Sequence, residues 1–121
     1  MSPVGALRWA DPVEQPPLPA GQVFDATIDG PPCVQPLPNA SKVIIGDEDC
    51  LWLKVSAPAR GDGGRGKDET KKRLKPIMLF IHGGAYHAGT VNGKWTDYKY
   101  DGAHFVENSG GNVVFVEIQV R

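Results

Sequence analysis

The sequence is poor in cysteine, in net charge and in long apolar runs. It has two cysteines in 121 residues, and 13 basic side chains against 14 acidic ones leave a formal net charge of −1. A charge so near zero gives no overall bias toward nucleic acid or anionic membranes. No apolar run approaches the roughly 20 residues of a bilayer-spanning helix, and residues 1–21 have prolines where a signal peptide needs an apolar segment. The sequence therefore assigns the chain no integral membrane segment and no location.

Patterns for phosphate, dinucleotide or metal binding are also missing. The segment 84–89 has the glycine spacing of a phosphate-binding loop, but Thr90 occupies the position of the required lysine. No G-x-G-x-x-G fingerprint lies between the central predicted strand and the helix after it. His82 and His87 are five residues apart with no glutamate beside the first, unlike the zinc-protease pattern. We expect no metal and no cofactor.

The apolar pattern predicts three strands and one helix, which favours an α/β fold. Residues 51–56 alternate in polarity, which is typical of a strand with one wetter face. The continuous apolar run Ile77–Ile81 predicts a central strand that is buried on both faces. A short helix is expected at 100–108, with Asp101 as its N-cap and a glycine as its stop, and the last strand at 113–120. This order favours a right-handed crossover in a parallel sheet.

Proline and glycine are concentrated outside these elements. The chain has 11 prolines and 15 glycines, many of them before Gly46, which predicts an irregular arm over residues 1–47 with a short extended stretch at 22–26. The segment 60–75 carries seven basic residues against three acidic ones. Its charge is compatible with a nucleic-acid patch, but the lack of interleaved aromatic residues favours a solvated loop. We expect no nucleic-acid partner.

The most informative feature is the turn that follows the central strand. Ile77–Ile81 runs directly into His82, Gly83 and Gly84. The two glycines lack a Cβ, so they can adopt positive φ and let a substrate carbonyl approach backbone N–H groups. Ligands of parallel sheets bind beyond the carboxyl ends of the strands, which is where residues 82–89 would lie. The sequence therefore predicts a site for an oxyanion.

This turn resembles the HGGG-type oxyanion loop of esterases and lipases, with Ala85 in place of the third glycine. The segment 48–55, E-D-C-L-W-L-K-V, is similar to a signature of the type-B carboxylesterase (cholinesterase-like) family, and 113–121 is similar to the strand after its oxyanion loop. Three further segments resemble the amino-terminal region of the family: 5–9, 24–27 and 33–35. The resemblance covers nearly the whole chain.

The resemblance implies the amino-terminal part of an α/β-hydrolase fold with a mixed, mostly parallel sheet. Residues 1–121 would form a partial, incomplete domain, because such folds need roughly 200 residues or more, and both ends look cut. The implied activity is hydrolysis of small-molecule or lipid esters through an acyl-enzyme. None of the four serines lies in the G-x-S-x-G elbow that would supply the nucleophile, and the acid and the histidine would also lie downstream. We expect the chain alone to be inactive.

The resemblance also assigns roles to residues of the turn. It makes the backbone N–H groups of Gly84 and Ala85 the oxyanion donors, with a third donor from the residue after the absent serine. It places Gly83 and Tyr86 against the substrate and gives His82 a structural role.

Cys33 and Cys50 match positions that are disulfide-bonded in the family, so we expect a bridge between them. Closing a loop of about 18 residues would stabilise the fold by roughly 3 kcal/mol. The alternative is two free thiols, because a count of two is weak evidence by itself. A bridge implies an oxidising compartment, in keeping with a family whose intact members are commonly secreted.

A second functional class stays open at this point. The same family contains non-catalytic, cholinesterase-like binding or adhesion proteins, and oxyanion glycines persist in some of them. A serine in an elbow downstream of the last strand would distinguish the enzyme from the binding protein. The acyl preference and the oligomeric state are not determined by these residues.

Overall fold

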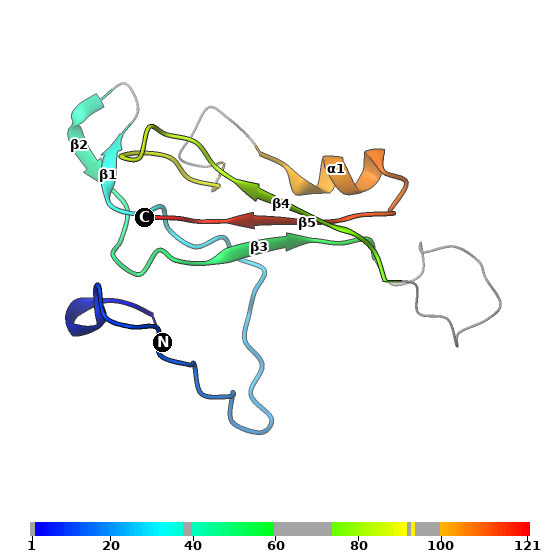
Figure 1. Ribbon diagram of the computed structural model, residues 1–121, viewed down its shortest axis with the longest axis horizontal. Helices are drawn as coiled ribbons and strands as arrows, with labels where there is room; N and C mark the ends of the chain where they lie inside the picture. Colours follow the sequence, from blue (N-terminus) through cyan, green and yellow to red (C-terminus); the bar gives the residue numbers. More distant parts are fainter. Residues whose placement is uncertain (1, 38–39, 60–73, 92, 94–99) are drawn as a thin grey trace.

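The computed structural model describes residues 2–37, 40–59, 74–91, 93 and 100–121 (Figure 1). None of the helices in these ranges is long or apolar enough to cross a membrane. Most of the basic segment, residues 60–73, lies outside the described residues. In chain order the elements are the 3-10 helix η1 (Gly5–Leu7), strands β1 (Gln35–Leu37), β2 (Ala40–Ile45), β3 (Leu53–Ser56) and β4 (Ile77–Ile81), helix α1 (Gly102–Asn108) and strand β5 (Val114–Ile118).

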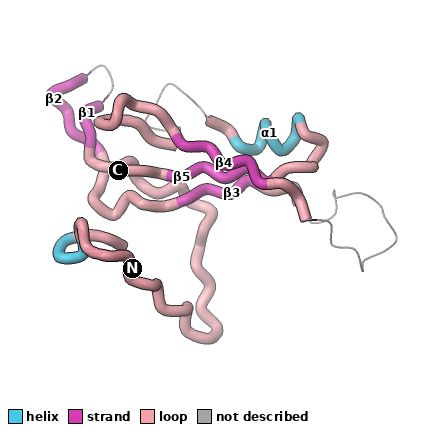
Figure 2. The backbone as a smooth tube through the Cα atoms, viewed as in Figure 1, coloured by secondary structure: helices cyan, strands magenta, loops and turns pink. Residues whose placement is uncertain are grey.

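Strands β3, β5 and β4 form a mixed sheet with β5 in the middle (Figure 2). β5 pairs antiparallel with β3 and parallel with β4, and Glu117 lies between Lys54 on one side and Phe80 on the other. The bounds predicted for β4 are confirmed, but its predicted central place is wrong. No strand of the described ranges pairs with its outer edge. A continuous apolar run indicates that a strand can be buried, but it does not indicate which strands pair with it.

Helix α1 connects the two parallel strands and has clear stop signals at both ends. The Asp101 side chain accepts a hydrogen bond of 3.0 Å from the backbone N–H two residues later, which confirms it as the N-cap. At the other end Gly110 has a φ of 63°, and its N–H donates to Glu107 O at 2.8 Å. The Gly111 N–H donates to Val106 O at 2.9 Å, which completes a Schellman motif. The predicted glycine stop is therefore confirmed.

An aromatic cluster forms the core between α1 and the sheet. Phe115 of β5 is buried and stacks on Phe105 of α1, with ring centroids 4.5 Å apart and planes 5° from parallel. Phe80 of β4 also stacks on Phe115, with ring centroids 6.2 Å apart. Gly102 permits this close packing, because a Cβ there would overlap the Ser56 side chain and the Phe115 ring.

The opposite face of the sheet is aliphatic; it is exposed along β3 and β4 and half-buried along β5. The alternation of the strands puts eight side chains on it, namely Leu53, Val55, Ile77, Leu79, Ile81, Val114, Val116 and Ile118. Residues of β4 are 46–69% exposed from Ile77 to Leu79, so the predicted burial of β4 on both faces is wrong. On β3 the polar row is the more covered one, the reverse of the predicted wetter face, because Lys54 and Ser56 point toward the arm and α1.

The segment 1–47, predicted to be irregular, contains η1 and an antiparallel pair of β1 and β2. The prolines that suggested irregularity are tolerated because both strands of a two-stranded sheet are edges, and the register shifts next to Pro36. The predicted extended stretch at 22–26 forms no strand. The pair lies beyond the carboxyl ends of β4 and β5 (Figure 1). Trp52 and Lys54 hold the arm to β3 by bonds to Pro31 O (2.8 Å) and Asp29 (3.4 Å).

Candidate active site at the carboxyl end of β4

The glycine turn after β4 has a left-handed backbone. Gly84 has a φ of 145°, and Ala85 and Tyr86 have φ values of 53° and 64°, which are costly for residues with a Cβ. The Gly84 carbonyl accepts hydrogen bonds from the N–H groups of His87 (3.2 Å) and Ala88 (3.0 Å), which closes the turn. A Cβ on Gly84 would overlap the Ala88 carbonyl, so only glycine fits at this position.

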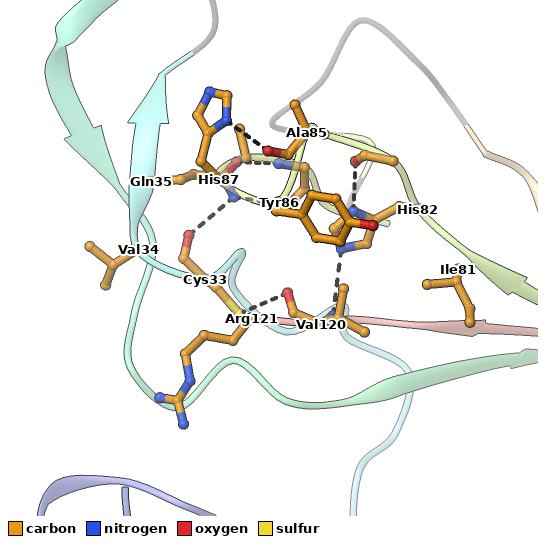
Figure 3. Close-up of a pocket in the computed structure, with 14 residues that line it drawn as sticks. Cys33, Val34, Gln35, Ile81, His82, Ala85, Tyr86, His87, Val120 and Arg121 are labelled. Carbon is orange, nitrogen blue, oxygen red and sulfur yellow. Dashed lines mark hydrogen bonds between the residues drawn. The ribbon is translucent and has the colours of Figure 1, made fainter. Parts of the chain in front are cut away.

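The turn leaves two consecutive amides available. Among the described residues, the N–H groups of Gly84 and Ala85 donate no hydrogen bond, and both residues are exposed. They line a hollow of about 640 Å³ at the carboxyl end of β4 (Figure 3). Gly83 and Tyr86 line the same hollow, with the Tyr86 side chain fully exposed. A hydrogen-bond acceptor that enters the hollow therefore finds two unpaired backbone N–H groups on residues that line it.

His82 connects the start of the turn to the end of the chain. Its Nδ1 lies 2.9 Å from Gly83 O, and its Nε2 lies 3.5 Å from the Val120 nitrogen (Figure 3). The same Nε2 lies 3.3 Å from Gln119 Nε2. A neutral imidazole with its proton on Nδ1 satisfies all three contacts, because Nε2 then accepts from both donors. In this arrangement both ring nitrogens are engaged in contacts within the chain.

Two buried glutamines that the sequence reasoning passed over lie beside the turn. Gln35 and Gln119 both hydrogen-bond to the backbone of Gly89, across 54 and 30 residues of chain respectively. A signal for them was present, because Gln35 follows a cysteine by two positions and Gln119 is a polar residue at the end of an apolar strand. The hydrophobic periodicity of the sequence does not indicate which distant residue a glutamine contacts, so neither residue was identified as part of the site.

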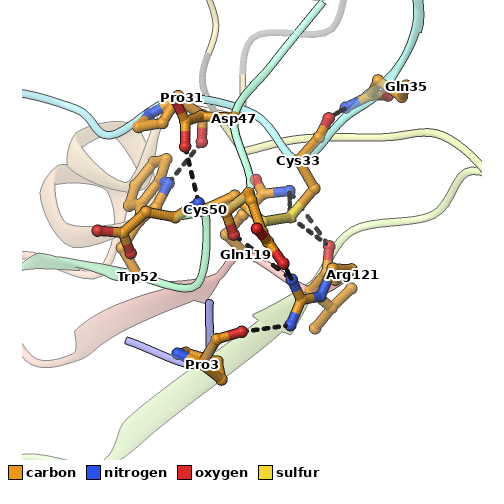
Figure 4. Close-up of a disulfide and its surroundings, with 12 residues drawn as sticks. Pro3, Pro31, Cys33, Gln35, Asp47, Cys50, Trp52, Gln119 and Arg121 are labelled. Atoms are coloured by element: carbon orange, nitrogen blue, oxygen red, sulfur yellow. Dashed lines mark hydrogen bonds and ion pairs between the residues drawn. A yellow bond between two sulfur atoms is a disulfide. The ribbon is translucent and has the colours of Figure 1, made fainter. Parts of the chain in front are cut away.

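The disulfide between Cys33 and Cys50 is present, with Cα atoms 4.9 Å apart, as the resemblance implied. Both cysteines are buried. The bridge joins the start of the β1–β2 pair to the segment before β3 (Figure 4). Gln119 Nε2 lies 3.8 Å from Cys33 Sγ, so the bridge and the turn share a neighbour.

Glu117 is a third buried polar residue that sequence reasoning passed over. It is 0% exposed, and its two carboxylate oxygens have no hydrogen-bond partner among the described residues. Burial raises the pKa of this carboxyl; Asp101 and Asp29 raise it further, while Lys54 and the Gly102 amide oppose the rise. It does not line the hollow beside the turn.

The side chains and backbone groups around the hollow set what it can bind. In the described ranges no group of three or more histidine, cysteine or acidic side chains is arranged to hold a metal ion. The residues that line the hollow include Gly84 and Ala85, whose N–H groups are unpaired among the described residues. Arg121 also lines it, but its guanidinium is directed away, to Glu48 and Pro3. Such a site can stabilise a negatively charged oxygen.

Comparison with known proteins points in the same direction. The chain matches the Carboxylesterase family over residues 1–121. Carboxylesterase 4A of Bos taurus is 32% identical over 130 residues, covering 98% of this chain and 20% of that protein. Para-nitrobenzyl esterase of Bacillus subtilis (strain 168) is 32% identical over 129 residues, covering 98% of this chain and 22% of that protein. Juvenile hormone esterase of Tribolium castaneum is 34% identical over 99 residues, covering 81% and 15%.

No solved structure matches the chain. The chain spans about a fifth of the length of the first two relatives. The match to the family nevertheless extends over every residue of the chain. The chain therefore belongs to the carboxylesterase family, which implies an α/β-hydrolase fold.

Proposed function

We propose that the turn after β4 is the oxyanion loop of a carboxylic ester hydrolase. The observation that carries the proposal is the pair of adjacent amides of Gly84 and Ala85, which donate no hydrogen bond among the described residues and belong to residues that line a hollow. In acyl transfer the carbonyl oxygen of the ester becomes negatively charged in the tetrahedral intermediate, and preorganised N–H groups stabilise that charge. Gly83 and Tyr86, which line the hollow, contact the ester, and His82 holds the loop.

The remaining catalytic groups belong, in this proposal, to the rest of a longer hydrolase. No serine of the chain lies in a G-x-S-x-G elbow, and the relatives are about five times as long as this chain. A serine from the remainder attacks the carbonyl of a small-molecule or lipid ester, the alcohol leaves, and water hydrolyses the acyl-enzyme. The disulfide between Cys33 and Cys50 supports folding in an oxidising compartment.

Two measurements test this proposal. Purified chain is incubated with p-nitrophenyl butyrate, and we expect no release of p-nitrophenolate above the buffer rate; clear turnover would show that the chain holds its own nucleophile. The transcript is also sequenced beyond the codon for Arg121, and we expect a G-x-S-x-G elbow after this strand. A transcript that continues through the family's domain without a serine in that elbow refutes the catalytic proposal.

A further inference from the structure

Two buried glutamines hydrogen-bond to the return leg of the glycine loop, residues 89–91. Gln35 is 6% exposed; its Nε2 donates to Gly89 O at 3.0 Å, and its Oε1 accepts from the Gly89 N–H at 2.6 Å (Figure 3). Gln119 is 4% exposed; its Oε1 accepts from the Val91 N–H at 3.1 Å, and its Nε2 lies 3.4 Å from Gly89 O. The side-chain amide of Gln35 thus pairs with Gly89 as a neighbouring strand would.

Fixing Gly89 also fixes the start of the loop. Gly89 has a φ of 127°, and a Cβ on it would overlap Gly83 O and the His82 ring. The return leg therefore packs directly on the entry leg of the loop, residues 82–83. The amide nitrogen of Gln119 also lies 3.3 Å from His82 Nε2, so this side chain contacts both legs.

The loop needs such external contacts. Ala85 and Tyr86 occupy left-handed conformations, which cost on the order of 1–3 kcal/mol each and persist only where the surroundings impose them. The loop's own backbone bonds in the described ranges are two, both to Gly84 O. The amides of Gly84 and Ala85 must stay unpaired to serve a ligand, so they contribute nothing to holding the loop.

We propose that Gln35 and Gln119 are positioning residues that hold the oxyanion loop in its amide-exposing conformation, acting through Gly89 and His82. The inference rests on the proposed function, because it takes the two amides as donors to an oxyanion. The property that it predicts, and that can be measured without a substrate, is the order of the loop. Buried amides that lose their partner are costly, so removal of either glutamine leaves the Gly89 or Val91 backbone groups unsatisfied. The loop then gains freedom, and the two donors lose their common direction.

The first experiment measures loop order in the full 121-residue chain by ¹⁵N relaxation. Order parameters of the Gly84 and Ala85 amides are compared in wild type, Gln35→Leu, Gln119→Leu and the control Gln15→Leu, which changes an exposed glutamine of the arm. We expect values of about 0.85 in wild type and in the control, and values below about 0.6 in the two loop variants. Equal order in all four proteins overturns the proposal, as does a wild-type loop that is already mobile.

A second variant separates hydrogen bonding from packing. In Gln35→Glu a protonated carboxyl can donate to Gly89 O and accept from its N–H, whereas the ionised carboxylate can only accept. Wild type is measured at the same two pH values, and its difference is subtracted so that the effect of other titrating groups is removed. We expect the loop of this variant, after that subtraction, to be more rigid at pH 4 than at pH 8. No remaining difference between the two pH values overturns the proposal.

Two features keep these experiments decisive. If either leucine variant loses the β5 amide signals and is therefore unfolded, the pH comparison of Gln35→Glu decides the question alone. ¹⁵N relaxation measures the order of the loop without any ester hydrolysis. If the glutamines do not position the loop, its order is unchanged in the variants. Failure of the proposed esterase function shows separately, in the missing elbow.

Discussion

Replacement of Glu117 by glutamine should change how the stability of the chain depends on pH. Glu117 is 0% exposed on β5, with Lys54 opposite it on β3, and its carboxylate oxygens have no hydrogen-bond partner among the described residues. Burial is the largest influence on its pKa and raises it above the reference value of 4.5. Asp101 and Asp29 act in the same direction, and the Lys54 ammonium opposes them.

The sign of the effect follows from proton linkage. A carboxyl with a folded pKa above its unfolded value binds more protons in the native state between the two values, so stability falls as pH rises through that window. The contribution is fully present below the unfolded pKa, near the reference value of 4.5, and is lost as pH passes the raised folded pKa. The slope within the window is at most about 1.4 kcal/mol per pH unit. Glutamine does not titrate, so Glu117→Gln lacks this slope.

Urea unfolding followed by circular dichroism measures the effect at pH 4, 5, 6, 7 and 8. The free energy of unfolding of Glu117→Gln relative to wild type should increase with pH and then level off. Glu117→Leu, which removes both unpaired oxygens, should be more stable than wild type by about 1–3 kcal/mol at pH 7. The exposed Glu14→Gln is the control and should follow wild type. Parallel pH profiles for Glu117→Gln and wild type would refute the reasoning.

Three further predictions concern the bridge, the loop and the helix. Reduction of the Cys33–Cys50 bridge, whose cysteines are 17 positions apart, should lower the free energy of unfolding by about 3 kcal/mol in urea titrations; an unchanged midpoint contradicts this. Gly84→Ala, which would overlap the Ala88 carbonyl, should move the amide resonances of the loop while those of β5 stay in place, and an unmoved loop spectrum contradicts this. Asp101→Ala should cost about 1 kcal/mol in the same titrations and Asp101→Asn much less, and equal costs would contradict capping.

The elements that sequence predicted correctly are those whose signals are local. The run Ile77–Ile81 is bounded by Pro76 and a glycine turn, so its limits needed no tertiary information. The Asp101 cap and the glycine stop of α1 are likewise bonds between residues two to five positions apart. The burial of β4 was predicted wrongly because burial depends on neighbours, and in the described ranges its aliphatic face has no covering element.

The β1–β2 pair was missed because its prolines argued against it and its stabilising contacts are distant. Its first residue, Gln35, contacts Gly89, and Cys33 just before it is bonded to Cys50. The β-branched run at 43–45 was the available local signal. Each proline lacks a backbone N–H donor, and an edge strand tolerates this because one of its sides pairs with no other strand.

The candidate site divides in the same way between local and distant causes. The glycine turn itself was predictable, because Gly83 and Gly84 follow the apolar run of β4 directly in the sequence. The supports, Gln35 and Gln119, were not, since they reach the loop across 54 and 30 residues. This division has a physical origin. Donors reserved for a ligand make no bond in the free protein, so a loop that carries them takes its order from other segments, and those segments leave no periodic signal in the sequence.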